Sequence, residues 1–236
     1  MIFEVKMCFR RKARFVTNGA KTPDLTTTNF AGVVSRESVR IALTYAALND
    51  IDVTVCDIRN TYLQAPSSER HYVICGSEFG LENVGKIALI RRALYGGKAS
   101  GADFWRHLRT YMTHLGFSSC KADSDIWMRP AVKDSGDEYW EYVLLYVDDA
   151  LVISNQGDKV ISKELGKCFY IKEESIGTPT LYLDNKVSQV ELENGRTAWS
   201  FSSSQYVQSA IKNIENRLHD MGLSLPKKCT SPISRE

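Results

Sequence analysis

The sequence predicts an α+β fold in which an antiparallel sheet carries helices on one face, and three observations support this prediction. Helical and strand patterns alternate irregularly, without the regular beat of a doubly wound parallel sheet. Two apolar segments are joined by a tight acidic turn near residue 148, which indicates a hairpin. Hydrophobic residues make up 43% of the 236-residue chain, enough to bury a substantial core.

The first predicted helix covers residues 33–48, because Ser35 is a favourable N-cap and apolar residues recur at helical spacing after it. The alternation that follows predicts a strand over residues 51–58. Asp57 continues the apolar side of this strand at its C-terminal end. A carboxylate that extends a core-facing stripe needs a specific reason.

The second half of the chain predicts a helix over residues 102–115 and a hairpin over residues 141–154, with Asp148 and Asp149 at its tip. A short helix is expected near residues 158–167. A longer helix is expected over about 203–218. The side chains expected to face inward from it are Tyr206, Val207, Ala210, Ile211 and Ile214.

Composition excludes several classes of protein. No apolar run reaches the roughly 18 residues that a transmembrane helix needs, and charges at Glu4 and Lys6 interrupt any signal peptide. The six cysteines contain no C-x-x-C pair, so no zinc site of the usual spacing is visible and reduced thiols are expected. We therefore expect an intracellular protein of the cytoplasm or nucleus, with no membrane partner.

The formal net charge of +2 hides an uneven distribution. Residues 1–21 and 86–109 each hold six basic residues and one acidic residue, so the rest of the chain is acidic. Basic segments of this kind suit phosphate backbones, although ordinary solvated surfaces have the same composition.

The feature most informative about chemistry is a set of three aspartates, Asp57, Asp148 and Asp149. If the hairpin packs beside the strand 51–58, all three carboxylates meet at one sheet edge. Carboxylates are the ligands that Mg²⁺ prefers, and two such ions can clamp the two oxygens of a phosphoryl displacement. Aspartates are also common in turns for their backbone hydrogen bonds, so spacing alone leaves both interpretations open.

The residues Tyr146-Val147-Asp148-Asp149 match the Y-V-D-D box of reverse transcriptases, and the surrounding chain resembles the copia-type retrotransposon polymerase. The resemblance covers about residues 1–230 and rests on six further blocks in order, which makes it more specific than a single motif. The blocks are Lys12–Val16, Val34–Arg40, Asp57–Leu63, Arg92–Gly96, Leu115–Phe117 with Lys121–Asp123, and Trp199–Ser200 leading into Ser204–Val207.

The resemblance implies a right-hand polymerase fold with an antiparallel palm sheet, fingers and an incomplete thumb. The fingers would cover about 1–31 and 67–98, and the palm about 32–66 and 99–195. The beginning of the thumb would cover about 196–236. The tail after Met221 suggests a linker that continues into more chain.

Functional roles follow by resemblance. Asp57, Asp148 and Asp149 would be the catalytic residues and the ligands of two Mg²⁺ ions, with Mn²⁺ as an alternative. Tyr62 matches the aromatic gate that excludes a ribose 2′-hydroxyl, and its other interpretation is a core tyrosine. The remaining predicted nucleotide-binding residues are Lys12, Arg14 and Lys98.

Some positions depart from the family pattern. Gly97 and Ala99 replace the residues usual after the Leu-Tyr-Gly block, and Asp184 stands where the family has glycine. The sequence therefore supports two hypotheses. The first is an RNA-directed DNA polymerase domain, a nucleotidyltransferase that uses deoxynucleoside triphosphates and an RNA or DNA template with primer. The second is a catalytically silent retroelement remnant that still binds nucleic acid. Other retroelement domains or a second polymerase chain are further expected partners.

Overall fold

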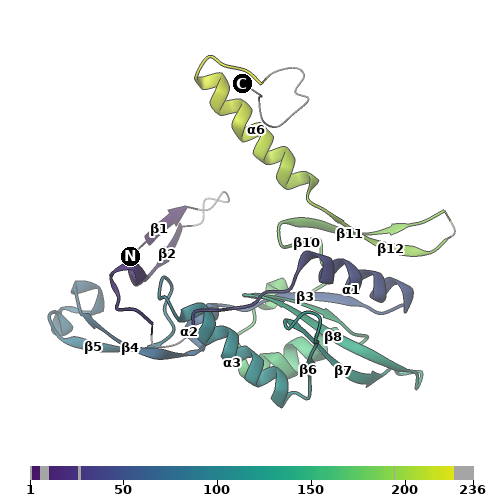
Figure 1. The fold of residues 1–236 in the computed structure, drawn as a ribbon, viewed down its shortest axis with the longest axis horizontal. Coiled ribbons are helices and arrows are strands. Elements are labelled where there is room, and N and C mark those ends of the chain that lie inside the picture. The colour runs from purple at the N-terminus through teal and green to yellow at the C-terminus, as the bar shows by residue number, and fades with distance from the viewer. Residues whose placement is uncertain (1, 6–10, 26–27, 194, 226–236) are drawn as a thin grey trace. The chain divides into compact units, whose positions relative to one another are not determined.

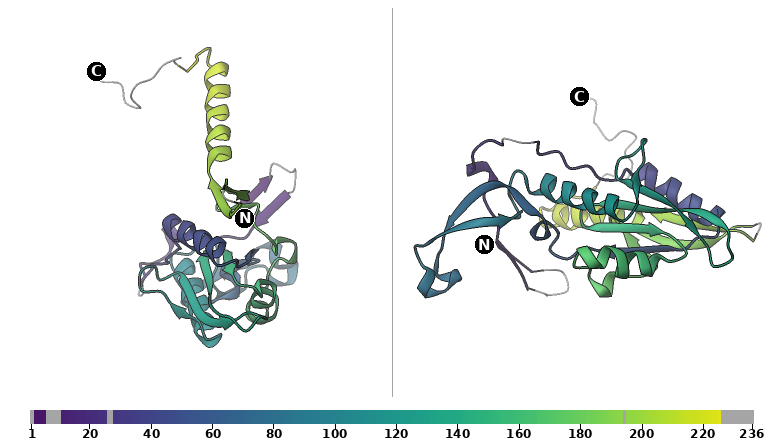
Figure 2. Two further views of the ribbon diagram at one scale, coloured as in Figure 1. Left: turned by 90° about the vertical axis from the view of Figure 1, so that its right-hand side faces the viewer. Right: turned by 90° about the horizontal axis from the view of Figure 1, so that it is seen from below.

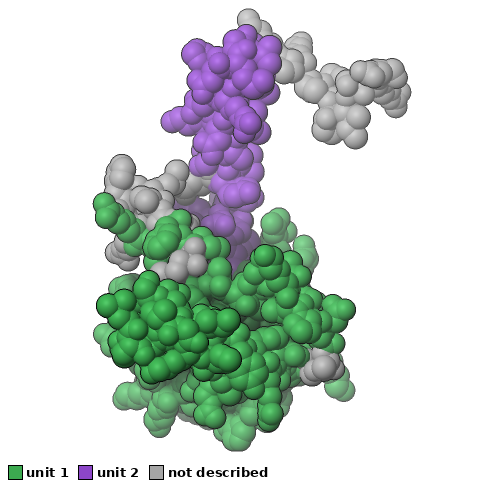
Figure 3. Space-filling model, turned by 90° about the vertical axis from the view of Figure 1, so that its left-hand side faces the viewer, with its two compact units in different colours: residues 1–178 green, residues 179–236 purple. Residues whose placement is uncertain are grey.

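The computed structural model describes residues 2–5, 11–25, 28–193 and 195–225 (Figure 1). The chain divides into two compact units, residues 1–178 and 179–236 (Figure 3). The subdivision into fingers, palm and thumb is a finer matter than this division and stays a prediction. No helix in the described part of the chain is long and apolar enough to cross a membrane.

The first unit contains most of the helices and strands. In chain order these are β1 (Ile2–Val5), β2 (Arg11–Arg14), η1 (Gly19–Lys21), α1 (Arg36–Leu48), β3 (Val53–Asp57), α2 (Thr61–Gln64), β4 (Pro66–Ile74), η2 (Ser77–Phe79), η3 (Leu81–Asn83), β5 (Ile87–Arg92), α3 (Ser100–His114), β6 (Ser118–Ser119), β7 (Ile126–Val132), β8 (Glu138–Tyr146), β9 (Asp149–Ile153), α4 (Gly157–Lys159), η4 (Val160–Leu165), α5 (Gly166–Cys168) and η5 (Glu173–Ser175). The second unit contains β10 (Leu181–Tyr182), β11 (Asn185–Glu191), β12 (Thr197–Ser202) and α6 (Ser204–Asp220).

A five-stranded antiparallel sheet in the order β3-β9-β8-β7-β6 forms the centre of the first unit. The predicted hairpin is present as β8 and β9, and the predicted strand 51–58 is present as β3 beside it. The mixed helix and antiparallel-sheet class predicted from the sequence is therefore confirmed. The edge strand β3 is closed by short pairings of Val55 with Gly177 and of Ile58 with Ile171.

Helices cover both faces of this sheet, so the expectation of helices on one face was wrong (Figures 1 and 2). On one face, Val143 and Val152 pack into a core with Phe104 of α3 and Leu165 of η4. Their neighbours along the strands point the other way. Leu151 is one of these and is also fully buried, on the side where α1 contacts β9. Strands buried on both faces lose their polar alternation, which is why the sequence did not show the second layer.

The N-terminus of α1 is fixed by two layers of hydrogen bonds. The Oγ of Ser35 accepts from the backbone N of Ser38 at 3.1 Å, which confirms the predicted N-cap. The carboxylate of Asp123 then accepts from Ser35 N at 3.0 Å and from Ser38 Oγ at 2.7 Å. These contacts join α1 to the loop between β6 and β7.

A partly buried charge network links the sheet to η4. Arg129 donates to Glu141 at 2.6 Å and to Glu164 at 2.7 Å, and its guanidinium lies 4.1 Å from the ring centre of Phe117. Glu141 is only 3% exposed and also accepts from Ser154 at 2.8 Å. Arg129 thus adds a polar contact between β7 and η4 to the apolar packing of Val160, Ile161 and Leu165 in the core.

The second unit is a three-stranded antiparallel sheet, β10-β11-β12, followed by α6. Leu183 and Asp184 form a two-residue turn between β10 and β11, with φ values of +49° and +59°. The long C-terminal helix was predicted correctly, but its apolar residues were wrongly expected to face inward. Tyr206, Val207 and Ile214 are exposed.

Candidate functional site

The three aspartates singled out in the sequence come together at one end of the central sheet. Asp57 ends β3 and is the direct cross-strand partner of Asp149, the first residue of β9. Directly opposed residues project from the same face of a sheet, so these two carboxylates are neighbours. Asp148 lies in the turn before Asp149, and its carbonyl accepts from Ile58 N at 2.7 Å.

The turn that carries Asp148 has a strained backbone. Only Val147 and Asp148 connect β8 to β9, and Val147 has a φ of +54°. A β-branched residue rarely adopts this conformation because its side chain crowds the backbone. Such strain persists where the surroundings impose it and is frequent at functional sites.

Lys172 completes the site, and sequence reasoning missed it. Its ammonium group forms an ion pair with Asp57 Oδ2, and its backbone N donates to the carbonyl of Asp57 at 2.9 Å. Ser175 adds a contact by accepting from Asp57 N at 2.8 Å. Lys172 follows Asp57 by 115 residues in a charged loop, so no local pattern connects the two residues.

The proton affinity of Asp148 is raised in this site. Burial raises the pKa of Asp148, and the neighbouring charge of Asp57 raises it further, while Lys172 and Lys12 act in the opposite direction. Burial also raises the pKa of the Cys56 thiol to about 12, with contributions from Asp57 and Asp149. Burial and the neighbouring carboxylate charges thus both act against ionisation of Asp148 and Cys56.

The carboxylate oxygens of the three aspartates are the type of ligand that a hard divalent cation prefers. Asp57 Oδ1 is buried and has no hydrogen-bond partner, and an unsatisfied carboxylate oxygen is costly unless a cation binds it. Oxygen-only donors are the set that Mg²⁺ takes. As the side chains stand in the described residues, no group of three acidic, histidine or cysteine side chains is arranged to hold a metal. The Oδ2 atom of Asp57 is instead paired with Lys172.

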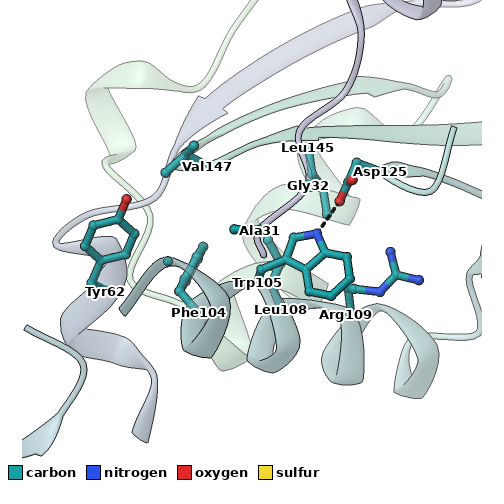
Figure 4. Close-up of a pocket in the computed structure, with 11 residues that line it drawn as sticks. Ala31, Gly32, Tyr62, Phe104, Trp105, Leu108, Arg109, Asp125, Leu145 and Val147 are labelled. Atoms are coloured by element: carbon teal, nitrogen blue, oxygen red, sulfur yellow. Dashed lines mark hydrogen bonds between the residues drawn. The ribbon is translucent and has the colours of Figure 1, made fainter. Parts of the chain in front are cut away.

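Tyr62 lies beside the aspartates in a cluster of rings. Its ring centre is 5.0 Å from that of Tyr95, and its pKa is raised by burial and by Asp148. Figure 4 shows Tyr62 and Val147 at one end of a small pocket of about 40 Å³. At the other end Trp105 Nε1 donates to Asp125 at 2.7 Å.

Two of the three predicted cationic residues reach this region. Lys12 and Arg14 alternate along β2 and so share one of its faces. Burial raises the pKa of Asp148 and of Tyr95, and the charges of Lys12 and Arg14 act in the opposite direction on Asp148 and Tyr95 respectively. Lys98 is turned elsewhere, because its ammonium donates to the carbonyls of Thr22 and Pro23 at 3.0 and 3.2 Å.

Two glycines allow the segment after β2 to pack closely against the segment after β5. Thr17 N donates to the carbonyl of Tyr95 at 2.8 Å, which joins the segment after β2 to the segment after β5. A Cβ atom at Gly96 would overlap the carbonyl oxygen of Thr17, and one at Gly19 would overlap that of Gly96. Gly96 also has a φ of +81°, which favours glycine. The two backbones can be this close only without side chains.

Comparison with known proteins identifies what the chain resembles. A family model described as reverse transcriptase (RNA-dependent DNA polymerase) matches residues 3–221. The Retrovirus-related Pol polyprotein from transposon RE2 of Arabidopsis thaliana is 28% identical over 171 residues, which are 70% of this chain and 11% of that protein. The corresponding RE1 polyprotein is 28% identical over 149 residues, or 62% of this chain and 10% of that protein.

A yeast protein gives a similar match. The Truncated transposon Ty1-A Gag-Pol polyprotein of Saccharomyces cerevisiae is 27% identical over 167 residues, covering 68% of this chain and 13% of that protein. The chain thus spans about a tenth of the length of these curated relatives.

Proposed function

Because the chain belongs to the copia-type reverse transcriptase family, we propose that it is an RNA-directed DNA polymerase domain that extends a primer 3′-hydroxyl with deoxynucleotides. The observation that carries this proposal is the meeting of Asp57, Asp148 and Asp149 at one sheet end. The buried, unpartnered Oδ1 of Asp57 adds a ligand position without a protein partner.

In this proposal Asp57 and Asp148 would be the principal ligands of two Mg²⁺ ions and Asp149 would support one of them, with Mn²⁺ as an alternative metal. When bound, such ions make the attacking hydroxyl more nucleophilic and stabilise the charge on the leaving pyrophosphate. The protein's own contribution is the placement of the carboxylates. β3 and β9 fix Asp57 and Asp149 in register, and the strained turn at Val147 fixes Asp148.

The nucleotide would lie between β2 and the ring cluster. Tyr62 would lie against the sugar and exclude a 2′-hydroxyl, and Lys12 and Arg14 would bind the triphosphate. Arg14 presents a planar fork that suits two phosphate oxygens. Lys98 would join them only after leaving its contacts with Thr22 and Pro23, so we give it a structural role first.

The partners of this domain would be an RNA or DNA template with its primer, and deoxynucleoside triphosphates. Other domains of a Pol polyprotein or a second polymerase chain are further proposed partners. The first of these is supported by the Pol polyprotein relatives, of which this chain covers only about a tenth.

Primer extension on an RNA template with Mg²⁺ tests the proposal. Asp148→Asn should reduce the extension rate by about a thousandfold, because metal-assisted stabilisation contributes several kcal/mol. Asp158→Asn, an exposed aspartate on α4, is the matched control and should extend as the wild type does.

The silent-remnant hypothesis makes the opposite prediction. A folded wild-type protein that retards primer–template in a gel but does not extend it would overturn the polymerase proposal. In that case, the first variants to test would replace Gly97, Ala99 and Asp184 by the residues usual in the family.

A further inference from the structure

A second concave surface lies beyond the three aspartates, between α2, α3 and the segment after η4. It is a groove of about 440 Å³, within the roughly 300–1,000 Å³ of typical ligand sites. Its lining includes Asn60, Gln64, Arg92, His107, Tyr111 and residues 166–170, and we call it the α2–α3 groove. None of the three aspartates lines it.

The charge of the α2–α3 groove is positive. Arg92 and Lys167 are its ionic lining residues, and the lining contains no Asp or Glu. Arg92 Nη1 donates to the carbonyl of Gln64 at 2.9 Å, which holds the guanidinium at the groove. Burial and the charge of Arg92 lower the pKa of His107, which disfavours the charged form of its ring. This is a surface that attracts anions.

Aromatic side chains form the wall of the same groove. Phe169 is buried, and its ring centre lies 5.2 Å from that of Tyr111 and 5.6 Å from that of His107. Tyr170 follows and is 76% exposed. An exposed ring on this wall is available for stacking.

The backbone of Tyr170 is nevertheless held firmly. Its N donates to Gln64 Oε1 at 2.8 Å, and its carbonyl accepts from Arg59 N at 2.8 Å. The ring therefore stands on a fixed main chain, so little backbone entropy is lost when a ligand stacks on it.

We propose that the α2–α3 groove binds one nucleotide of a single-stranded nucleic acid, with the phosphate at Arg92 and Lys167 and the base stacked on Tyr170. Cations combined with exposed aromatic rings are the pattern by which proteins bind single strands without reading sequence. A duplex would hide the base faces that Tyr170 needs. The proposal does not depend on polymerase activity, because none of the three aspartates takes part.

The proposal is tested by measuring how a labelled six-nucleotide single-stranded RNA binds to the full chain. The measurement is fluorescence anisotropy in the presence of EDTA. Tyr170→Ala should raise the Kd about tenfold, the order of one lost base stack. Tyr170→Phe keeps the ring and should bind as the wild type does. Lys167→Glu should weaken binding and reduce the slope of log K against log salt by about one.

Lys163→Glu is the matched charge control, because Lys163 is exposed on η4 and does not line the groove. Circular dichroism confirms that each variant is folded. Unchanged Kd values for both Tyr170→Ala and Lys167→Glu would overturn the proposal. Adenosine monophosphate and the unlabelled hexanucleotide should also be compared as competitors of the labelled RNA. If both displace it at the same concentration, the site binds a free nucleotide rather than a strand, and the proposal is overturned.

Discussion

The ion pair of Lys172 and Asp57 gives the sharpest test of the site. The two side chains are 35% and 28% exposed, so the pair is neither fully solvated nor fully buried. Two unit charges 4 Å apart attract by about 4 kcal/mol in a medium typical of protein surfaces. Desolvation and the ordering of a long side chain offset much of this, so we expect a net coupling of about 1–2 kcal/mol.

The measurement is a double-mutant cycle in EDTA with Lys172→Met, Asp57→Asn and the double variant, each unfolded in urea. Lys172→Met should be the most destabilised, because it leaves the carboxylate of Asp57 unpaired beside Asp148. A Lys163→Met variant on the exposed side of η4 controls for loss of a lysine as such.

Metal binding supplies an independent arm of the same experiment. Lys172 occupies Asp57 Oδ2, so its removal should tighten the binding of Mn²⁺ measured by calorimetry and should restore stability when Mn²⁺ is added. A coupling energy indistinguishable from zero in EDTA, or weaker Mn²⁺ binding by Lys172→Met, would refute the reasoning.

Four further predictions concern other parts of the chain. Asp184→Gly should stabilise the protein by about 0.5–1 kcal/mol in urea unfolding, because glycine adopts a φ of +59° without a steric penalty; a loss would contradict this. Arg129→Met should cost about 3–5 kcal/mol, since it leaves Glu141 buried and unpaired; recovery in an Arg129→Met, Glu141→Gln double variant is the check. Tyr62→Val should increase ribonucleotide incorporation in primer extension relative to the wild type, and unchanged selectivity would exclude a gate. Asp123→Asn should cost about 1 kcal/mol at pH 7 through the cap of α1. Burial acts to raise the pKa of Asp123, but hydrogen bonds from Ser35 and Ser38 lower it overall, so its ionised form favours folding. The difference in stability between the wild type and this variant should persist above pH 3.8 and shrink as the pH falls through the lowered pKa. Thermal unfolding across that pH range measures it.

Local chemistry explains what the sequence could predict. The hairpin β8–β9 follows from two apolar runs and a short acidic turn, and the Ser35 cap follows from side-chain chemistry within one helical turn. The meeting of Asp57 with Asp149 needed one further assumption, that β3 lies beside β9, and the register supports it. Patterns of this kind act over a few residues or between adjacent elements.

Contacts between distant residues explain what the sequence could not predict. Lys172 and Asp57 are 115 residues apart, and Arg129 reaches Glu164 across 35. Neither pair has a spacing rule. The second helical layer was missed because Val143 and Leu144 are consecutive and both fully buried, so this part of β8 does not alternate between buried and exposed residues.

The distribution of charge was a weaker guide than it appeared from counting alone. Within the basic segment 86–109, Arg106 pairs with Asp103, and Arg109 donates to the carbonyl of Ser124 and lies over the ring of Trp105. These two cations already have partners within the protein. A count of basic residues does not separate such groups from those that face a ligand.

The close approach at Gly19 and Gly96 has a consequence for how decayed copies of such elements are recognised. A substitution at either glycine would push the strand bearing Lys12 and Arg14 away from Asp148 and Tyr95. The sequence would still contain all three aspartates, and a motif search would score the copy as intact. Loss of function in a retroelement lineage can therefore begin at positions that no catalytic signature contains, where the smallest side chain is the requirement.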